Sequence, residues 1–459
     1  MRIKRSFFRG TLILLASLLI GALAMPLSAA DGVNPLSLTE SIDQALKSSV
    51  LIHAAREGVR GAEAQRKEAF TGFLPKLSTS YSYTRYNQDP YLAFPGIPPV
   101  IPPANLTVGT KDNYNWILEA RQPLFAGGAI LANYEASRIG ADIARLDEAS
   151  TVQDLVLEVK IAYFNILKAG RILAVAKQSV EQLQTHRNTA QSFYDQGMIP
   201  RNDLLQAEVE LANGRQLLLR SENGLELARS KFNTLLRRPI DTPVEIEDIL
   251  NDRPYEKTFD ACIAVALGNR PEIRSFALRR EQAKSQVKVS QSEYYPSVSL
   301  VGNYAKYGDT PGVAGSSFKD QESWYVMAVA NWNLWEWGKT KNRVEFGQSR
   351  ENQVADFLAN VRDQITLEVK NAFLLLREAE KQIQVTAKAI EQAEENFRIN
   401  TERYREQVGT STEVIDAQTL LTKARSDRHN ALGDFNISRA RLEKAMGVST
   451  TEYFDKERQ

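Results

Sequence analysis

The stretch LEVKIAYFNIL occupies residues 157–167, and a close copy, LEVKNAFLLL, occupies residues 367–376. The same offset of 210 positions relates other pairs on either side, among them Tyr194 and Tyr404. Nearer the N-terminus the offset becomes 221, because LPKLS at Leu74 matches YPSVS at Tyr295. Self-similarity at a fixed period indicates a repeated structural unit. The sequence therefore predicts two copies of one unit.

Each copy has the pattern of a helix, two strands, a long helix and a last helix. Strict alternation predicts the strands, and apolar residues at steps of three and four predict the helices. Repeat 1 spans 31–237, with strands at about 76–86 and 113–124 and helices at about 38–73, 128–196 and 202–236. Repeat 2 spans 258–447, with strands at about 297–307 and 322–334 and helices at about 338–406 and 412–446. A Pro- and acid-rich connector, 238–257, joins the repeats, and 448–459 form a polar tail.

The helices carry coiled-coil seams, in which apolar residues step alternately by three and four. Val152, Leu155 and Val159 belong to the seam of the long helix in repeat 1, and Ile365 and Val369 to that of repeat 2. Each long helix extends roughly 100 Å at 1.5 Å per residue. The helix before the strands and the last helix together match this length, so we expect them to stack end to end beside it. Four long rods per chain would result.

The strands share one arrangement of faces. One face is apolar and aromatic in all four strands, whereas the other is mostly small and polar. The apolar face comprises Leu77, Thr79, Tyr81 and Tyr83; Tyr114, Trp116, Leu118 and Ala120; Val298, Leu300, Gly302 and Tyr304; and Trp324, Val326, Ala328 and Ala330. This alternation fits a half-buried sheet of a soluble protein and equally a membrane β-barrel, whose sequence signal is weak.

The first thirty residues read as a secretory signal peptide, with Arg and Lys before an apolar run and small residues before Asp31. No later window is apolar enough for a transmembrane helix. The net charge of +1 gives no sign of a nucleic-acid partner. Three isolated His residues and a lone cysteine, Cys262, offer no metal site, and no nucleophile and base are paired. The sequence therefore indicates neither a cofactor nor an enzyme.

A membrane sheet must close, because open edges would leave backbone groups unpaired in hydrocarbon. Four strands are too few, since bacterial barrels begin at about eight. If these strands span a membrane, several chains must contribute to one barrel, and the sequence itself leaves their number open.

The duplicated unit, PLFAGG at 123–128, the phrase at 157–167 and VGTSTEVIDAQ at 408–418 resemble the TolC-type outer-membrane efflux protein family. The resemblance covers residues 38–447. It implies a homotrimer with a twelve-stranded barrel in the bacterial outer membrane and a twelve-helix tunnel in the periplasm. It also implies a channel for efflux or type I secretion, without enzyme activity, that works with a periplasmic adaptor and an inner-membrane transporter. The alternative is a soluble periplasmic coiled-coil adaptor or structural protein, in which a single helical hairpin is expected.

The resemblance also suggests functional residues. Carboxylates that narrow the periplasmic mouth correspond to Glu413 and Asp416, with Asp203 as the counterpart in repeat 1; the alternative is an ordinary solvated pair. The expected adaptor-contacting tips are Gly197, Met198, Ile199 and Pro200, and Val408, Gly409, Thr410 and Ser411. The expected membrane-interface aromatics are Tyr81, Tyr83, Tyr114, Trp116, Tyr304 and Trp324.

Two further stretches have open interpretations. Trp332, Trp335 and Trp337 suit either an interfacial aromatic belt or core packing where strands meet helices. The Pro-rich segment 89–109 lies where a barrel would place an extracellular loop, and its proline density suits neither helix nor sheet.

Overall fold

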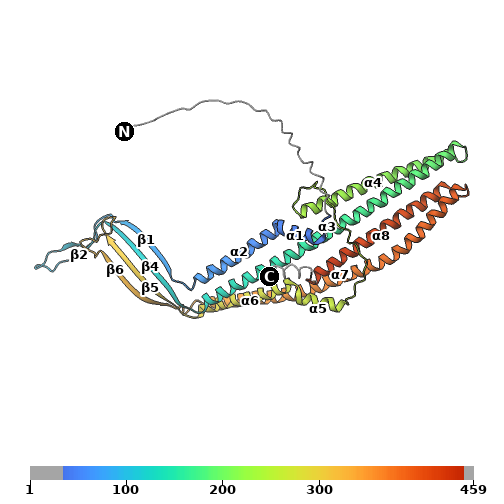
Figure 1. Cartoon of the computed structure of the whole chain (residues 1–459). Helices are drawn as coiled ribbons and strands as arrows, with labels where there is room; N and C mark the ends of the chain where they lie inside the picture. Colours follow the sequence, from blue (N-terminus) through green and yellow to red (C-terminus); the bar gives the residue numbers. More distant parts are fainter. Residues whose placement is uncertain (1–34, 449–459) are drawn as a thin grey trace, which may run out of the picture.

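The computed structural model describes residues 35–448. The molecule is elongated, with a β-sheet at one end and long helices that extend to the other (Figure 1). The expected signal peptide and nearly all of the expected C-terminal tail lie outside the described residues.

The order of elements confirms the duplicated unit. Repeat 1 contains α1 (Leu38–Ser48), α2 (Val50–Thr71), β1 (Lys76–Arg85), β2 (Tyr91–Phe94), β3 (Ala104–Thr107), β4 (Asp112–Ala126), α3 (Ala129–Asp195) and α4 (Arg201–Leu235). Repeat 2 contains α5 (Phe259–Asn269), α6 (Pro271–Gln291), the 3-10 turn η1 (Ser292–Tyr294), β5 (Ser297–Gly308), β6 (Glu322–Asn331), α7 (Lys339–Arg405) and α8 (Ser411–Ala445). Strand β6, expected to reach residue 334, ends at Asn331 because its partner β5 begins at Ser297, opposite that residue.

The helices form four parallel rods, of which two are continuous and two are composite. Helix α3 has 67 residues, and α7 has the same number. Helices α2 and α4 meet end to end beside α3, where the Ser48 hydroxyl donates to the carbonyl of Leu236 over 3.1 Å. Helices α6 and α8 meet in the same way, because Arg270 Nη1 donates to the carbonyls of Lys444 (3.3 Å) and Ala445 (3.4 Å). The expected end-to-end stacking is thus present in both repeats.

The expected single helix at 38–73 is wrong, since the chain turns at Ser49. There the backbone is extended (φ −67°, ψ 125°), and the Ser49 side chain accepts from the amide of Ile52 to cap α2. Arg270 holds the equivalent position in repeat 2, with nearly the same dihedrals and Pro271 as the first residue of α6. The short helices before these breaks, α1 and α5, pack on α3 and α7 respectively.

The predicted seams form the core. In repeat 1, Val152, Leu155 and Val159 are buried with Phe232 of α4 and Ile52 of α2. The core of repeat 2 is built in the same way, with seam residues of α7 buried against α8. Arg428 interrupts the seam of α8, but its Nη1 donates to the carbonyl of Ile383 on α7 over 2.8 Å. The seam thus accommodates this cation through a backbone acceptor of α7.

The main sheet has the order β1-β4-β5-β6, and every neighbouring pair is antiparallel. Its register places the predicted apolar positions opposite one another, as in the row Thr79, Leu118, Tyr304 and Trp324. Side chains at directly opposed positions share a face, so the common apolar and aromatic face is confirmed. The outer edges of β1 and β6 have no strand partner among residues 35–448.

The Pro-rich segment is more ordered than expected. Strands β2 and β3 pair as a separate antiparallel hairpin, in the register Tyr91 with Thr107 to Phe94 with Ala104. The prediction that this segment suits neither helix nor sheet was wrong, because its prolines lie outside these two short strands. The hairpin extends beyond the main sheet at the end away from the helices (Figure 1).

Candidate functional site

The helix tips lie opposite the sheet, and each is a tight turn (Figure 1). After α3, Gly197 adopts φ +72°, and the Met198 amide donates to the carbonyl of Phe193 over 2.9 Å. This pattern closes the helix with a left-handed residue, a conformation that Gly adopts at no steric cost. Met198 is 51% exposed, whereas Ile199 packs against the small core of Leu204 and Ala207. Pro200 precedes the first turn of α4.

The second tip has the same turn with a different residue. Gln407 occupies the position of Gly197 with φ +61°, and the Val408 amide donates to the carbonyl of Arg403 over 2.9 Å. The side-chain Nε2 of Gln407 lies 2.8 Å from Met198 Sδ, so the two tips are in contact. Val408 is 67% exposed at this tip.

The three predicted carboxylates occupy different environments. Glu413 forms a capping box with Thr410: its Oε2 accepts from the Thr410 amide (2.9 Å), and Thr410 Oγ1 accepts from its amide (3.3 Å). Its Oε1 also lies 3.7 Å from Arg403 Nη1. The Asp416 side chain is exposed one turn later, and its carboxylate forms no hydrogen bond or ion pair within residues 35–448. Asp203 is half-buried in the first turn of α4.

A polar contact joins the hairpins of the two repeats near the tips. Gln418 Nε2 on α8 donates to Gln182 Oε1 on α3 over 2.9 Å, and Thr422 Oγ1 donates to Ser179 Oγ over 3.1 Å. Nearer the tip, Thr412 and Gln206 form a further hydrogen bond of 3.1 Å. Within each hairpin, by contrast, the seam is apolar. The packing between hairpins therefore depends on hydrogen bonds more than the packing within them.

His186 is also buried in this contact, with 9% of its surface exposed. Its Nε2 lies 2.9 Å from the hydroxyl of Ser411, and its ring centroid lies 4.9 Å from that of Tyr404. Burial lowers the pKa of His186 to about 4, so its imidazole is neutral at physiological pH. Burial also raises the pKa of Tyr404, and the nearby charge of Asp203 adds to the effect. Ser411, expected on the tip surface, is 1% exposed and so belongs to this buried contact.

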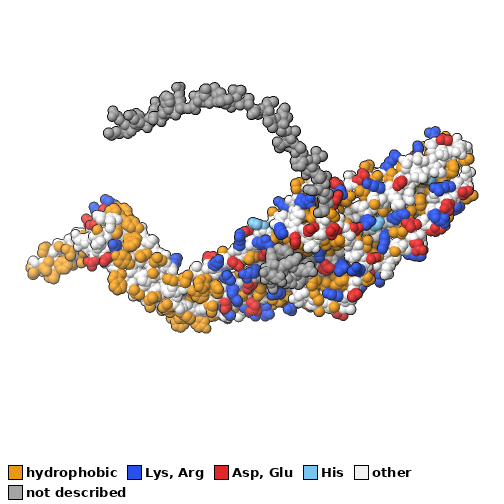
Figure 2. Space-filling model, in the orientation of Figure 1, with side chains coloured by type: hydrophobic (Ala, Val, Ile, Leu, Met, Phe, Trp, Pro, Cys, Tyr) orange, Lys and Arg blue, Asp and Glu red, His pale blue; other side chains and the backbone are white. Residues whose placement is uncertain are grey.

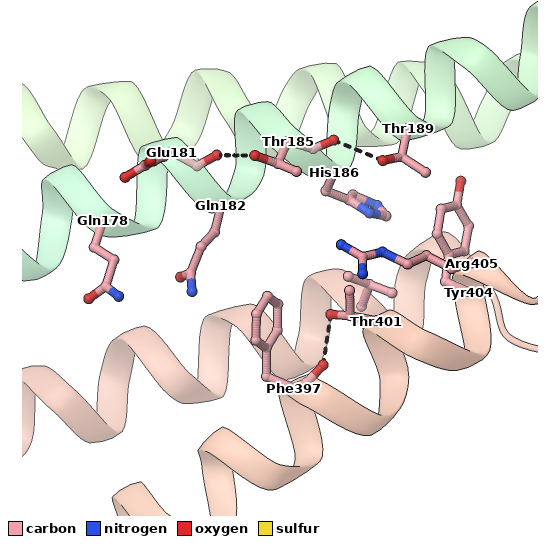
Figure 3. Close-up of a pocket in the computed structure, with 11 residues that line it drawn as sticks. Gln178, Glu181, Gln182, Thr185, His186, Thr189, Phe397, Thr401, Tyr404 and Arg405 are labelled. Atoms are coloured by element: carbon pink, nitrogen blue, oxygen red, sulfur yellow. Dashed lines mark hydrogen bonds between the residues drawn. The ribbon is translucent and has the colours of Figure 1, made fainter.

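A cavity of about 350 Å³ opens beside His186, between α3 and α7. Figure 3 shows His186 facing Tyr404, with Arg405 extending into the gap between the helices. The threonine hydroxyls of the wall donate to their own helices, as Thr401 does to the carbonyl of Phe397 over 2.7 Å. The cavity thus interrupts the packing of the two hairpins immediately next to the tips.

The predicted interface aromatics lie together on the apolar face of the sheet. Tyr83 stacks on Tyr114 with ring centroids 4.6 Å apart, and Trp116 meets Tyr304 edge-on at 6.0 Å. Tyr81 and Trp324 are exposed on the same face. Trp332, Trp335 and Trp337 are also exposed, by 57%, 73% and 87%, so they are not core packing. The molecular surface around the sheet is accordingly rich in hydrophobic side chains, whereas charged groups cover the helices (Figure 2).

Among the described residues, no helix is both long and apolar enough to cross a membrane. Comparison with protein families gives a match to the outer membrane efflux protein family over residues 41–236 and again over 262–448. The chain belongs to this family. The two matches coincide with the two repeats, so each repeat is one copy of the family's unit.

Named relatives support this assignment. The chain is similar to Nodulation protein T of Rhizobium leguminosarum bv. trifolii, with 20% identity over 90% of this chain and 86% of the relative. It is also similar to Outer membrane protein TolC of Escherichia coli (strain K12), with 19% identity over 64% of this chain and 62% of the relative. Among solved structures, the Campylobacter jejuni CmeC outer membrane channel has a TM-score of 0.78 at 17% identity and covers 92% of this chain and 89% of its own.

The protein is therefore an outer-membrane channel that serves as the exit duct of an efflux system. Its sheet is the part in the outer membrane, and its long helices lie in the periplasm.

Proposed function

We propose that three copies of the chain close one twelve-stranded barrel, with their helical rods forming a common tunnel beneath it. The observation that supports this most directly is the open sheet: four strands with one apolar, aromatic face and two edges without a strand partner in the described chain. In hydrocarbon such edges must be paired. Pairing β1 of one copy with β6 of the next satisfies both.

The size of the lumen favours three copies over two. Two copies would give eight strands, and the interior of an eight-stranded barrel is just wide enough to be filled by side chains. Three copies give the smallest closed sheet of this unit that leaves a pore. The resemblance to the TolC-type family implies the same number.

The periplasmic mouth is proposed to open by separation of the two hairpins of each chain. Their contact near the tips consists of hydrogen bonds such as Gln418 to Gln182, which water can replace, whereas each hairpin retains its apolar seam. Asp203, Glu413 and Asp416 are the proposed carboxylates of this mouth. Three copies of each would favour cations and repel anions at a constriction.

The proposed partners are a periplasmic adaptor and an inner-membrane transporter. Met198 and Val408 are apolar and exposed at the tips, which suits contact with an apolar helical surface. The neighbouring residues Gly197, Gly409 and Thr410 shape the same turns. Among the relatives, one is named Toxin and drug export protein A, of Aggregatibacter actinomycetemcomitans. The proposal covers transporters for small compounds and for secreted proteins.

The trimer is tested by extracting the protein from outer membranes and measuring its mass in detergent by light scattering. A heat-resistant species of three chains supports the proposal. A monomer released with the soluble periplasm would instead favour a soluble coiled-coil protein.

The opening is tested with the double variant Ser179→Cys, Thr422→Cys, at positions whose hydroxyl oxygens lie 3.1 Å apart in the unmodified protein. Cys262 is buried, so it does not compete for oxidation. Oxidation is expected to link α3 to α8 and abolish export and most of the conductance in planar bilayers, and reduction to restore both. The single variants are the controls. Full conductance of the linked protein would rule out separation at this contact.

A further inference from the structure

The β2–β3 hairpin, defined as residues 90–110, is an exposed apolar arm. No charged residue occurs between Pro90 and Thr110. Large apolar side chains along it are exposed by between 42% and 78%: Tyr91, Leu92, Phe94, Ile97, Val100, Ile101, Leu106 and Val108. Hydrophobic side chains cover this end of the molecule (Figure 2). A surface of this kind needs a cover of matching character.

The arm is preformed. Besides the strand pairing, the Ile97 amide donates to the carbonyl of Ile101 (2.8 Å), and the Val108 amide donates to that of Pro90 (2.8 Å). Gly96 turns the chain with φ +73°, and a Cβ there would lie 2.5 Å from the carbonyl oxygen of Ile101. The arm therefore keeps its shape and holds its apolar side chains outward.

The other loop at this end of the sheet behaves differently. Residues 309–321, between β5 and β6, lean back on the sheet, where the Tyr81 hydroxyl donates to the carbonyl of Pro311 over 2.7 Å. This loop carries Asp309, Lys319 and Asp320. It is thus held by its own sheet and is too polar to cover the arm.

A charged collar separates the arm from the apolar face of the sheet. Arg85 Nη1 lies 3.1 Å from Asp112 Oδ1, and Asp89 Oδ1 accepts from the amide of Lys111 over 2.8 Å. Charges of this kind mark the border of the hydrocarbon layer. Because the arm continues beyond the collar, lipid chains are not its cover.

We propose that the β2–β3 hairpins of neighbouring copies pack against one another over the outer mouth and form an apolar constriction. This proposal rests on the shared barrel proposed above. The arm follows β1, the edge strand at which a second copy would join, so each arm lies at a subunit boundary. At this end of the barrel, the arms of the neighbouring copies provide the uncharged surfaces that can cover each arm.

Such a constriction would control passage by dewetting. A narrow apolar ring excludes water and ions while it is closed, because hydration of an apolar neck is unfavourable. Apolar contacts, and no hydrogen bonds, would hold the arms of neighbouring copies together. A bulky substrate can therefore separate the arms, which then close again behind it. The channel would then have a second barrier, distant from the carboxylates at the helix tips.

The first test is cross-linking of Val100→Cys, at a side chain 78% exposed at the end of the arm. Oxidation of whole cells is expected to give a disulfide-linked dimer of chains. The matched control is Ser317→Cys, exposed on the β5–β6 loop, which is expected to stay uncrosslinked.

The second test is the triple variant Leu92→Ser, Val100→Ser, Leu106→Ser in planar bilayers. Conductance is expected to rise about twofold or more, since polar side chains keep the neck wet. Unchanged conductance together with absent Val100→Cys dimers overturns the constriction.

Two other outcomes distinguish a failure of the shared barrel from a failure of the packing between arms. If the unmodified protein forms no oligomer in detergent, the shared barrel itself fails and the constriction with it. If the oligomer is intact but a lipid-borne quencher reaches a fluorophore at Val100→Cys, the arm lies in the membrane, and only the packing between arms is overturned.

Discussion

Glu413 and Asp416 lie one turn apart on α8, and both side chains are acidic. Only Glu413 also caps the helix, through its hydrogen bonds with Thr410. Asp416→Asn is expected to lower the cation preference of the pore without changing thermal stability, because the Asp416 carboxylate has no partner among the described residues. Glu413→Ala should lower the preference and also remove the side-chain acceptor of the capping box, which costs about 1 kcal/mol. Reversal potentials in planar bilayers, with melting followed by circular dichroism, separate the two effects. Unaltered selectivity in both variants would remove these residues from the mouth.

His186 makes the contact between hairpins sensitive to pH. Its pKa is about 4 in the folded protein, below the ordinary 6.5. The buried neutral form is favoured, so the stability that it contributes is complete above pH 6.5 and is lost as the pH falls towards 4, by about 3 kcal/mol in all. Glu181, Tyr404 and Arg405 line the cavity beside it, and the charge of Asp203 acts on Tyr404.

Acidification across this range is therefore expected to loosen the hairpin contact, measured as a rise in conductance. His186→Gln keeps a polar side chain that does not titrate and should flatten this part of the pH profile. His53→Gln, at an exposed position, is the matched control. An identical profile in His186→Gln would assign the response to other groups, such as the carboxylates.

Some of these residue roles were within reach of the sequence. Thr410 and Glu413 form the T-x-x-E pattern of a capping box, which predicts the cap that the structure contains. The contact between His186 and Ser411 was not predictable, because the two residues are 225 positions apart and no periodicity relates them. The burial of Ser411 could not be predicted for the same reason, because it depends on contact with the neighbouring hairpin.

At the scale of elements, the two end-to-end joints have different strengths. Arg270 is 4% exposed, forms ion pairs with Glu272 (2.9 Å) and Glu368 (3.0 Å), and also bonds the end of α8. Arg270→Ala removes the donor to the buried carbonyl of Ala445 and the cation beside the partly exposed Glu272 and Glu368, and is expected to cost about 2–3 kcal/mol. Ser49→Ala at the equivalent joint loses one cap, about 1 kcal/mol. Thermal melting in detergent should rank them in this order, and equal shifts would contradict it.

The elements themselves were largely predictable, and the exceptions have physical causes. Alternation and heptad periodicity extend over many residues, so the strands of the main sheet and the long helices were located within a few residues. The break at Ser49 lacks a Gly or Pro, and its signal is visible only through the repeat, where Arg270 precedes Pro271. The β2–β3 hairpin was missed because strands of four residues between prolines are too short for a periodic signal.

At the scale of the whole molecule, a lysine substitution is expected to have opposite effects on the two faces of the sheet, even at neighbouring residues. Val326 lies on the apolar face of β6, and Met327 on the other. Val326→Lys places a charge in lipid and is expected to cost about 2–4 kcal/mol, which reduces the oligomer recovered from outer membranes. Met327→Lys faces the proposed lumen and should assemble normally. Recovery measured by quantitative gel analysis checks this, and the reverse order would mean that the sheet is oriented the other way.

The two composite rods differ from α3 and α7 in how they respond to load. A continuous helix transmits bending along its full length, whereas a rod in two pieces yields at its joint, held here by side-chain bonds such as that from Ser48 to Leu236. The continuous helices α3 and α7 thus support the two composite rods along their length. Because α3 and α7 run unbroken past both joints, a movement of the tips is expected to bend the composite rods at their joints and the continuous helices gradually along their length. The bore at the tips can then change with a smaller displacement at the sheet.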